Sequence, residues 1–271
     1  DSKGNCWIGT NAGLYVKPRG QKVKCFISGD EINQIYEDSY HNIWISTHTD
    51  GCYLKKSGGG LEHFTFLPKN NWQSLYSITQ TDISESDRIS SNMVRGIAED
   101  DNGNIWLGTF LGLNKYNPRT GKFSVFAQTN NPYSISHSSV FPVFKDKKGT
   151  IWVGTYYGGV NYFNPNEDIF TFYSADIEKD NCLSSPIVGH MVEDKRGDLW
   201  VCTEGGGLNK LNRKTGKITH YLANSSGNSI AHNNLKCIVY DKDNDRLYIG
   251  THTGGISIFD RPAQLHFPMF I

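Results

Sequence analysis

The sequence lacks an excess of charge of either sign and lacks any long apolar run. It holds 27 Lys and Arg residues against 27 Asp and Glu residues, so its formal net charge is zero. A nucleic-acid-binding surface needs a basic excess to displace the counterions of the phosphate backbone, and this composition does not supply one. No run of 18 apolar residues is present. We therefore expect no nucleic-acid partner and no direct membrane insertion by this segment.

Motifs for metals and phosphates are also lacking. The six cysteines are scattered without CxxC or zinc spacing, and no HExxH pair occurs among the nine histidines. The glycine runs at 58–60 and 205–207 lack the following Lys-Ser/Thr of a phosphate-binding loop. The sequence therefore predicts no metal site, no cofactor and no catalytic constellation.

Aromatic residues and glycine are plentiful. The chain contains 14 Tyr, 14 Phe and 6 Trp, together with 28 Gly. Aromatic side chains favour strands, and Gly with Asn and Asp favours tight turns. This combination predicts an all-β protein made of many short strands.

One sequence motif recurs six times along the chain. An aromatic anchor follows an Asp by six residues in five repeats and by seven in the last, and a Gly follows the anchor after six or seven residues. The anchors are Trp7, Trp44, Trp106, Trp152, Trp200 and Tyr248. Such a regular recurrence identifies a repeat protein.

Each repeat predicts four antiparallel strands. A short apolar run precedes the Asp, a turn such as DNGN leads to the anchor strand, and two further strands follow a Gly-rich turn. Four strands in about 45 residues make one blade of a β-propeller, whereas the repeats of β-solenoids are usually shorter. We therefore interpret residues 1–271 as a single β-propeller domain or a propeller fragment. Its six repeat units span about 1–28, 29–67, 91–128, 138–174, 185–223 and 232–271.

The spacing between the second and third anchors is longer than the others. The additional residues form a long loop between blades, over about 67–91, and carry Trp72 and Tyr76 outside the repeat pattern. An aromatic loop of this length is either a plain connection or part of a binding surface.

The repeated motif strongly resembles the two-component regulator propeller repeat. Residues 100–123 (DDNGNIWLGTFLGLNKYNPRTGKF) fit that pattern almost throughout, and related phrases cover essentially the whole chain. The second and sixth repeats depart from it, with SYHN in the place of the Gly turn and Tyr248 in the place of Trp.

This resemblance implies a periplasmic sensor. In that family the repeats form propellers in the periplasmic part of membrane-anchored histidine kinases, very often hybrid kinases of Bacteroides-like bacteria that respond to complex glycans. It implies an oligosaccharide or other small ligand, self-association with the same sensor and a typically seven-bladed ring. We expect this chain to be one part of a longer sensor, and six repeats leave open whether the ring closes.

Candidate binding residues are expected where the repeats differ. The residue after each Gly-Thr pair, or its equivalent, changes from repeat to repeat and lies in the turn that follows the anchor strand. In a propeller these turns share one face with the connections between blades, and aromatic, Asn, His and Glu side chains suit sugars as well as protein partners. The candidates are Asn11, His48, Phe110, Tyr156, Tyr157, Glu204 and His252.

Two other function classes remain open at this stage. Propellers also serve as enzymes that act on polysaccharides, as lyases or hydrolases, and others serve as scaffolds for protein interactions. The repeat Asp residues occur once per unit, which is typical of a structural role rather than a catalytic one. His48 and His252 occupy equivalent turns and form a candidate pair for one ligand, although solvated turn histidines fit the pattern too.

Overall fold

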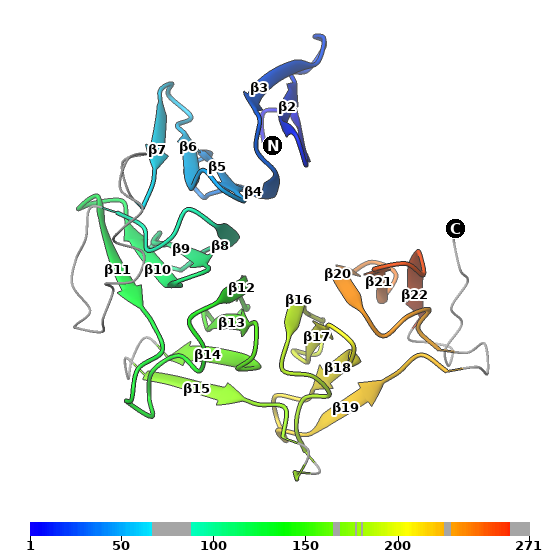
Figure 1. The fold of residues 1–271 in the computed structure, drawn as a ribbon. Coiled ribbons are helices and arrows are strands. Elements are labelled where there is room, and N and C mark those ends of the chain that lie inside the picture. Colours follow the sequence, from blue (N-terminus) through cyan, green and yellow to red (C-terminus); the bar gives the residue numbers. More distant parts are fainter. Residues whose placement is uncertain (67–87, 165–168, 177, 180, 225–228, 261–271) are drawn as a thin grey trace. The chain divides into compact units, whose positions relative to one another are not determined.

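The computed structural model describes residues 1–66, 88–164, 169–176, 178–179, 181–224 and 229–260, and these residues form strands and turns only (Figure 1). The chain divides into two compact units, residues 1–145 and 146–271. No helix among the described residues is long and apolar enough to cross a membrane. The predicted loop at 67–91, with Trp72 and Tyr76, lies outside the described residues except at 88–91.

The first unit contains three sheets followed by one further strand. The sheets have the orders β1-β2-β3, β4-β5-β6-β7 and β8-β9-β10-β11, so each strand pairs with its neighbour in the sequence (Figure 1). The strands are β1 (Cys6–Thr10), β2 (Gly13–Lys17), β3 (Lys24–Ser28), β4 (Ile32–Glu37), β5 (Ile43–Thr47), β6 (Cys52–Lys55), β7 (Leu61–Phe64), β8 (Val94–Glu99), β9 (Ile105–Thr109), β10 (Gly112–Asn117), β11 (Lys122–Phe126) and β12 (Val140–Lys145).

The second unit continues the same plan. Its sheets run β13-β14-β15, β16-β17-β18-β19 and β20-β21-β22, again antiparallel throughout. The strands are β13 (Ile151–Thr155), β14 (Val160–Asn164), β15 (Ile169–Tyr173), β16 (Val188–Glu193), β17 (Leu199–Thr203), β18 (Gly207–Leu211), β19 (Ile218–Tyr221), β20 (Leu235–Asp241), β21 (Arg246–Thr251) and β22 (Ile256–Asp260). Together the strands fall into six sheets, one in each predicted repeat, which confirms the predicted β-propeller fold.

The repeat Asp and the anchor Trp hold the first turn of each sheet together. In the second sheet, Asp38 accepts a hydrogen bond from Trp44 Nε1 at 2.9 Å and further bonds from the backbone N–H groups of Tyr40 and Asn42. The same Asp–Trp bond occurs in five repeats, at 2.8–2.9 Å. Because the carboxylate satisfies turn amides and the indole at once, these Asp residues have the structural role that the repeat pattern predicts.

The second turn of each sheet is held by the Thr that ends the anchor strand. Its hydroxyl donates to the carbonyl of the following repeat Gly, as in Thr203 to Gly207 at 2.8 Å, and all six repeats contain this bond. Gly207 has a φ of +69°, and an added Cβ would lie 2.5 Å from the carbonyl oxygen of Tyr221. Only glycine fits this position, because a side chain would be strained and would collide with the neighbouring strand.

Neighbouring sheets pack face to face through the anchors. Trp44 packs with Ile97, Leu107, Tyr116 and Phe123 of the next sheet, and Trp44 and Tyr116 meet edge to face at 5.5 Å. In the second unit, Trp200 packs with Leu247 and Phe259 in the same manner. The large aromatic surface removed from water at each contact is the main stabilising contribution to the stacking of sheets.

Candidate functional site

The seven predicted site residues all lie in the turn between the anchor strand and the next strand. Asn11, His48 and Phe110 belong to the first unit. Tyr156, Tyr157, Glu204 and His252 belong to the second. The Thr–Gly bonds described above shape each of these turns, so the variable side chains stand on a fixed backbone.

Main-chain hydrogen bonds tie each turn to the loop that leads into a first strand. In the first unit, the N–H of Gly51 donates to the carbonyl of Asn92 at 2.8 Å, and the N–H of Phe110 donates to the carbonyl of Met93 at 3.1 Å. Asn92 and Met93 are consecutive, so this loop connects the turn that holds His48 with Phe110 in the next sheet. The two candidates therefore lie along one edge of the first unit.

The second unit repeats this connection twice. Gly159 and Glu204 donate their N–H groups to the carbonyls of the consecutive residues Pro186 and Ile187. Gly207 and His252 do the same with Asn233 and Asn234. The turns that carry Tyr156 and Tyr157, Glu204 and His252 thus follow one another along a single edge of the second unit.

The two tyrosines form the aromatic part of this edge. Tyr156 is 37% exposed and Tyr157 is 58% exposed. Their rings meet edge to face with centroids 4.5 Å apart, which fixes each ring relative to the other. Exposed aromatic rings held in this way offer a flat apolar face to a ligand.

Charged and polar groups lie next along the same edge. Glu204 forms an ion pair with Lys236 of the following strand β20, with Nζ and Oε1 2.5 Å apart. Asn234, two residues before Lys236, has a buried Oδ1 atom without a hydrogen-bond partner in the described part of the chain. A buried acceptor without a donor is costly, so this oxygen is suited to receive an O–H or N–H from a bound molecule or water.

The structure adds residues that sequence reasoning missed. Arg95 on β8 lies beside Phe110, with its guanidinium carbon 5.3 Å from the ring centroid, and 4.1 Å from that of Phe141 on β12. Arg95 and Lys236 both occupy the second position of a first strand. The signal was present in the sequence, because that position changes in kind between repeats: Asn33, Arg95, Phe141, Gly189 and Lys236.

Two predictions from the sequence stay predictions, namely ligand binding by Asn11 and the sharing of one ligand by His48 and His252. Asn11 is exposed in its turn, and His48 is held by a backbone bond from its N–H to the carbonyl of Glu31 at 2.9 Å. His48 and His252 belong to different units, so their sharing of one ligand stays a prediction. Within the described residues, no three His, Cys, Asp or Glu side chains form a group that could hold a metal ion.

Four segments of the chain match a known family model. The model describes the two component regulator propeller, and it matches residues 27–49, 88–110, 134–157 and 182–205. Each match ends within one of the variable turns, at Thr49, Phe110, Tyr157 and Gly205. No curated protein matches the chain in sequence.

Solved structures share the fold at low sequence identity. The extracellular domain assigned to a hybrid two-component system of B. thetaiotaomicron has a TM-score of 0.56 at 23% identity, covering 100% of this chain and 39% of that one. A second such domain from the same organism has a TM-score of 0.56 at 17% identity, covering 100% of this chain and 42% of that one. A streptogramin B lyase has a TM-score of 0.69 at 13% identity, covering 100% of this chain and 81% of that one. This chain thus spans about two fifths of the length of the two extracellular domains.

Proposed function

From the match of four segments to the two component regulator propeller model, we propose that the chain is the ligand-sensing part of a two-component sensor, with no catalysis of its own. The observation that carries the proposal is the row of side chains that differ between repeats, each on a turn with the same hydrogen bonds. The repeats keep the backbone of each turn constant while the side chain after the anchor strand changes, and these turns lie along a shared edge within each unit. A rigid scaffold with variable side chains at its turns is the usual construction of a binding surface.

The ligand we propose is an oligosaccharide. Tyr156 and Tyr157 offer apolar faces for the C–H groups of a sugar ring, while Glu204, Lys236 and the free acceptor of Asn234 match its hydroxyl groups. Ligand sites combine apolar surface with a few placed polar groups in this way. Binding triggers a signal if the ligand has a higher affinity for one conformation of the receptor than for another. A ligand with equal affinity for both leaves the equilibrium between them unchanged.

The same proposal places the module outside the cytoplasm, in the periplasm, as part of a membrane-anchored receptor that associates with a second copy of itself. The similarity to extracellular domains of hybrid two-component systems supports the compartment. Topology mapping with reporter fusions to the full-length protein tests it. A cytoplasmic reporter signal at this segment would contradict the placement.

Calorimetric titration of the chain with a panel of oligosaccharides tests the ligand class. We expect at least one member of the panel to bind. Tyr156→Ala and Tyr157→Ala should each weaken that binding by about twofold to tenfold, because stacking on one aromatic ring contributes roughly 0.5–1.5 kcal/mol. Tyr133→Ala is the matched control, since Tyr133 is also 58% exposed but lies in a different loop of the first unit.

The same samples distinguish sensing from catalysis. Mass spectrometry of each oligosaccharide after incubation should show no new product. Turnover of any member of the panel would replace this proposal with that of a propeller enzyme. If no member binds, or if the tyrosine variants bind as the unaltered chain does, the proposed surface is wrong.

A further inference from the structure

The buried side-chain oxygen of Asn234 has no donor among the residues that the structure describes. Asn234 directly precedes β20, and its Oδ1 atom is shielded from solvent without a hydrogen-bond partner there. Its main chain is engaged, since the N–H donates to His232 Nδ1 at 2.9 Å and the carbonyl accepts from the N–H of His252 at 2.9 Å. The backbone at this position is therefore fixed, and the side-chain oxygen is the group that a bound molecule can satisfy.

The equivalent residue of the first unit does have a donor. Ser139 directly precedes β12, as Asn234 precedes β20, and its hydroxyl accepts a hydrogen bond from Arg95 Nη1 at 2.9 Å. Arg95 is the second residue of β8, the first strand of the preceding sheet. In the second unit the corresponding position, the second residue of β16, is Gly189. Because glycine has no side chain to donate, Asn234 lacks the donor that Ser139 has.

Gly189 lies against the strand that begins beside Asn234. β16 and β20 lie side by side (Figure 1). A Cβ atom added to Gly189 would lie 2.8 Å from the carbonyl oxygen of Leu235, the residue after Asn234. The backbone would have to shift to accept it, so the close approach of β16 to β20 favours glycine here. The packing of the two sheets thus keeps a donor-bearing side chain away from the acceptor.

The contacts of Arg95 show which other positions border the same place in the first unit. Its guanidinium carbon lies 5.3 Å from the ring centroid of Phe110, which follows β9, and 4.1 Å from that of Phe141, the second residue of β12. The corresponding residues of the second unit are Glu204, which follows β17, and Lys236, the second residue of β20. These two form an ion pair, with Nζ and Oε1 2.5 Å apart. The unsatisfied acceptor is thus bordered by a carboxylate and an ammonium group whose charges cancel.

From this arrangement we infer that Asn234, with Glu204 and Lys236, forms a subsite for a hydroxyl group of an uncharged sugar. The hydroxyl donates its hydrogen to Asn234 Oδ1, and its oxygen accepts from the ammonium group of Lys236. A carboxylate or sulfate has no hydrogen to donate, and its charge would meet the oxygens of Asn234 and Glu204. An ammonium group would meet the cation of Lys236. The inference rests on the proposed sensing function and makes it more specific, since it assigns an uncharged sugar to the second unit.

The test uses glucose, galactose and mannose, which present the same hydroxyl groups in different arrangements. NMR titration of the chain, with nitrogen-15 in its asparagine side chains, measures the dissociation constant of each sugar and the shift of the Asn234 amide resonance. We expect at least one sugar to bind and to move that resonance. Fluorine cannot donate a hydrogen bond. Replacing one hydroxyl of that sugar by fluorine, at carbon 2, 3, 4 or 6 in turn, should weaken binding about tenfold or more at one of these carbons, because the buried acceptor then has no donor.

Two substitutions separate binding from a structural role. Asn234→Leu removes the acceptor and should weaken binding of that sugar about tenfold or more, whereas Asn234→Asp keeps an acceptor oxygen and should retain most of it. Without sugar, Asn234→Leu should unfold at a temperature no lower than the unaltered chain does, because it removes a buried oxygen that has no donor. Ser139→Ala is the matched control, since that hydroxyl already has a donor, and it should leave sugar binding unchanged. Thermal unfolding of each variant establishes that it is folded at the temperature of the titration.

The outcomes distinguish the subsite from the proposed function. The subsite is overturned if none of the three sugars moves the Asn234 resonance, if all four fluorinated derivatives bind as the parent sugar does, or if folded Asn234→Leu binds as the unaltered chain does. A lower unfolding temperature of Asn234→Leu assigns the amide a structural role and overturns the subsite too. Each of these results leaves the sensing function intact when a member of the oligosaccharide panel binds. Absence of binding by all three sugars and by the whole panel overturns both.

Discussion

The carboxylate of Glu99 accepts two hydrogen bonds from Ser39, one from its backbone N–H at 2.8 Å and one from its hydroxyl at 2.5 Å. Glu99 ends the first strand of one sheet, and Ser39 follows the repeat Asp of the preceding sheet. Glu99 is only 8% exposed. The bond therefore fixes the position of one sheet against the next at a buried contact.

The same two positions meet at other contacts between sheets. Glu37 accepts from the backbone N–H of Ser2 at 2.7 Å, and Glu193 accepts from the backbone N–H of Lys147 at 3.1 Å. At one contact the strand-end position holds a cation instead of a carboxylate. Lys145 ends β12 there and pairs with Asp101, which follows the repeat Asp, at 2.5 Å. The register between sheets is thus set by a repeated polar contact as well as by the aromatic core.

Loss of the Glu99 contact should destabilise the first unit. We expect Glu99→Ala to lower the free energy of unfolding by about 2 kcal/mol, because hydrogen bonds to charged groups each contribute about 1.5–3 kcal/mol. Glu99→Gln, which keeps one acceptor oxygen, should cost about 1 kcal/mol. Urea unfolding measures both values. Glu31→Ala, an exposed glutamate in the same unit, is the control, and equal effects at the two sites would contradict the argument.

The buried turn Asp of the fifth repeat should matter more than its counterpart in the sixth. Asp194 accepts bonds from Trp200 Nε1 and from the N–H groups of Arg196 and Asp198. Asp194→Ala leaves these donors without partners and should cost about 3 kcal/mol or more. Asp241 accepts bonds from Asp243 and Asn244 of its own turn, and the anchor of this repeat is Tyr248. Asp241→Ala should therefore cost about 1 kcal/mol. Chemical unfolding of the two variants should show this order, and the reverse order would count against it.

Arg213 should be essential to the stability of the second unit. Its guanidinium pairs with Asp146 at 2.6 Å and Glu193 at 3.0 Å, and all three side chains are at least 87% buried. Arg213→Ala leaves two buried carboxylates without their cation, and we expect a loss of about 3–5 kcal/mol. The neighbouring exposed Lys214→Ala should change stability by less than about 0.5 kcal/mol. Thermal and urea unfolding measure the difference, and a loss below about 1 kcal/mol for Arg213→Ala would refute the network.

Acid should weaken the contact between the first two sheets. The hydroxyl of Ser2 holds the pKa of Glu37 below its ordinary value of 4.5, with help from the Ser2 N–H and His41. Because the folded state has the lower pKa, the stabilisation is complete above pH 4.5 and is lost as the pH falls through the lowered pKa. Ser2→Ala should bring the Glu37 pKa closer to 4.5. Carbon-13 titration of the carboxyl group measures it, and an unchanged pKa would show that the hydroxyl is not its cause.

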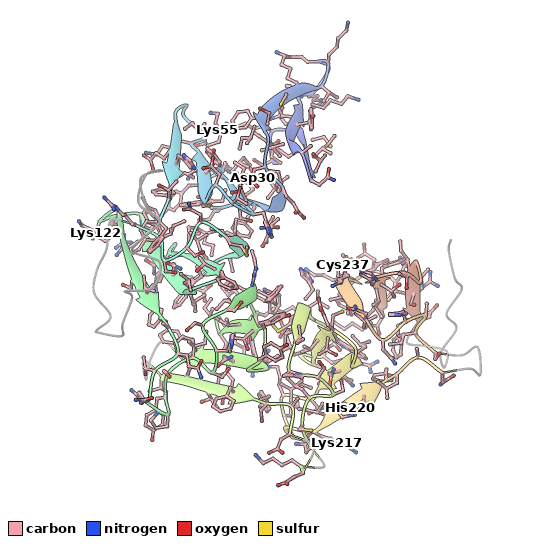
Figure 2. The ribbon with its side chains drawn as sticks, viewed as in Figure 1. Asp30, Lys55, Lys122, Lys217, His220 and Cys237 are labelled. Atoms are coloured by element: carbon pink, nitrogen blue, oxygen red, sulfur yellow. The ribbon has the colours of Figure 1, made fainter. Side chains whose placement is uncertain are left out.

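The six free cysteines should fall into separate classes of reactivity. Cys6, Cys25 and Cys237 are exposed, whereas Cys52 and Cys202 are buried. Figure 2 labels Cys237 on the first strand of the last sheet. Burial raises the pKa of the Cys52 and Cys202 thiols, so these two form little of the reactive thiolate.

Brief treatment with iodoacetamide, followed by peptide mass spectrometry, measures this difference. We expect rapid labelling at the three exposed thiols and protection at Cys52 and Cys202. All six should react once the chain is unfolded in urea. Labelling of Cys52 at the rate of Cys6 would show that the core around Trp44 opens easily.

Local structure followed closely from the sequence. The Asp, Trp, Thr and Gly of each repeat act within one turn or hairpin, so their spacing predicted the six sheets and the turns that carry the seven candidate residues. Sequence difference between repeats also located the variable turn. These interactions join residues a few positions apart. The same turn therefore forms wherever the motif recurs in the sequence.

Contacts between sheets required the tertiary structure. Arg95 meets Phe141, Glu204 meets Lys236, and Arg213 meets Asp146, and none of these pairs follows from the repeat spacing. Each pair joins residues from different repeats. Whether they meet depends on how two sheets pack and on which side-chain conformation the packing allows. The sequence by itself therefore determined which turns carry the seven candidate residues, and only the packing of the sheets decided which charged and aromatic groups lie beside those turns.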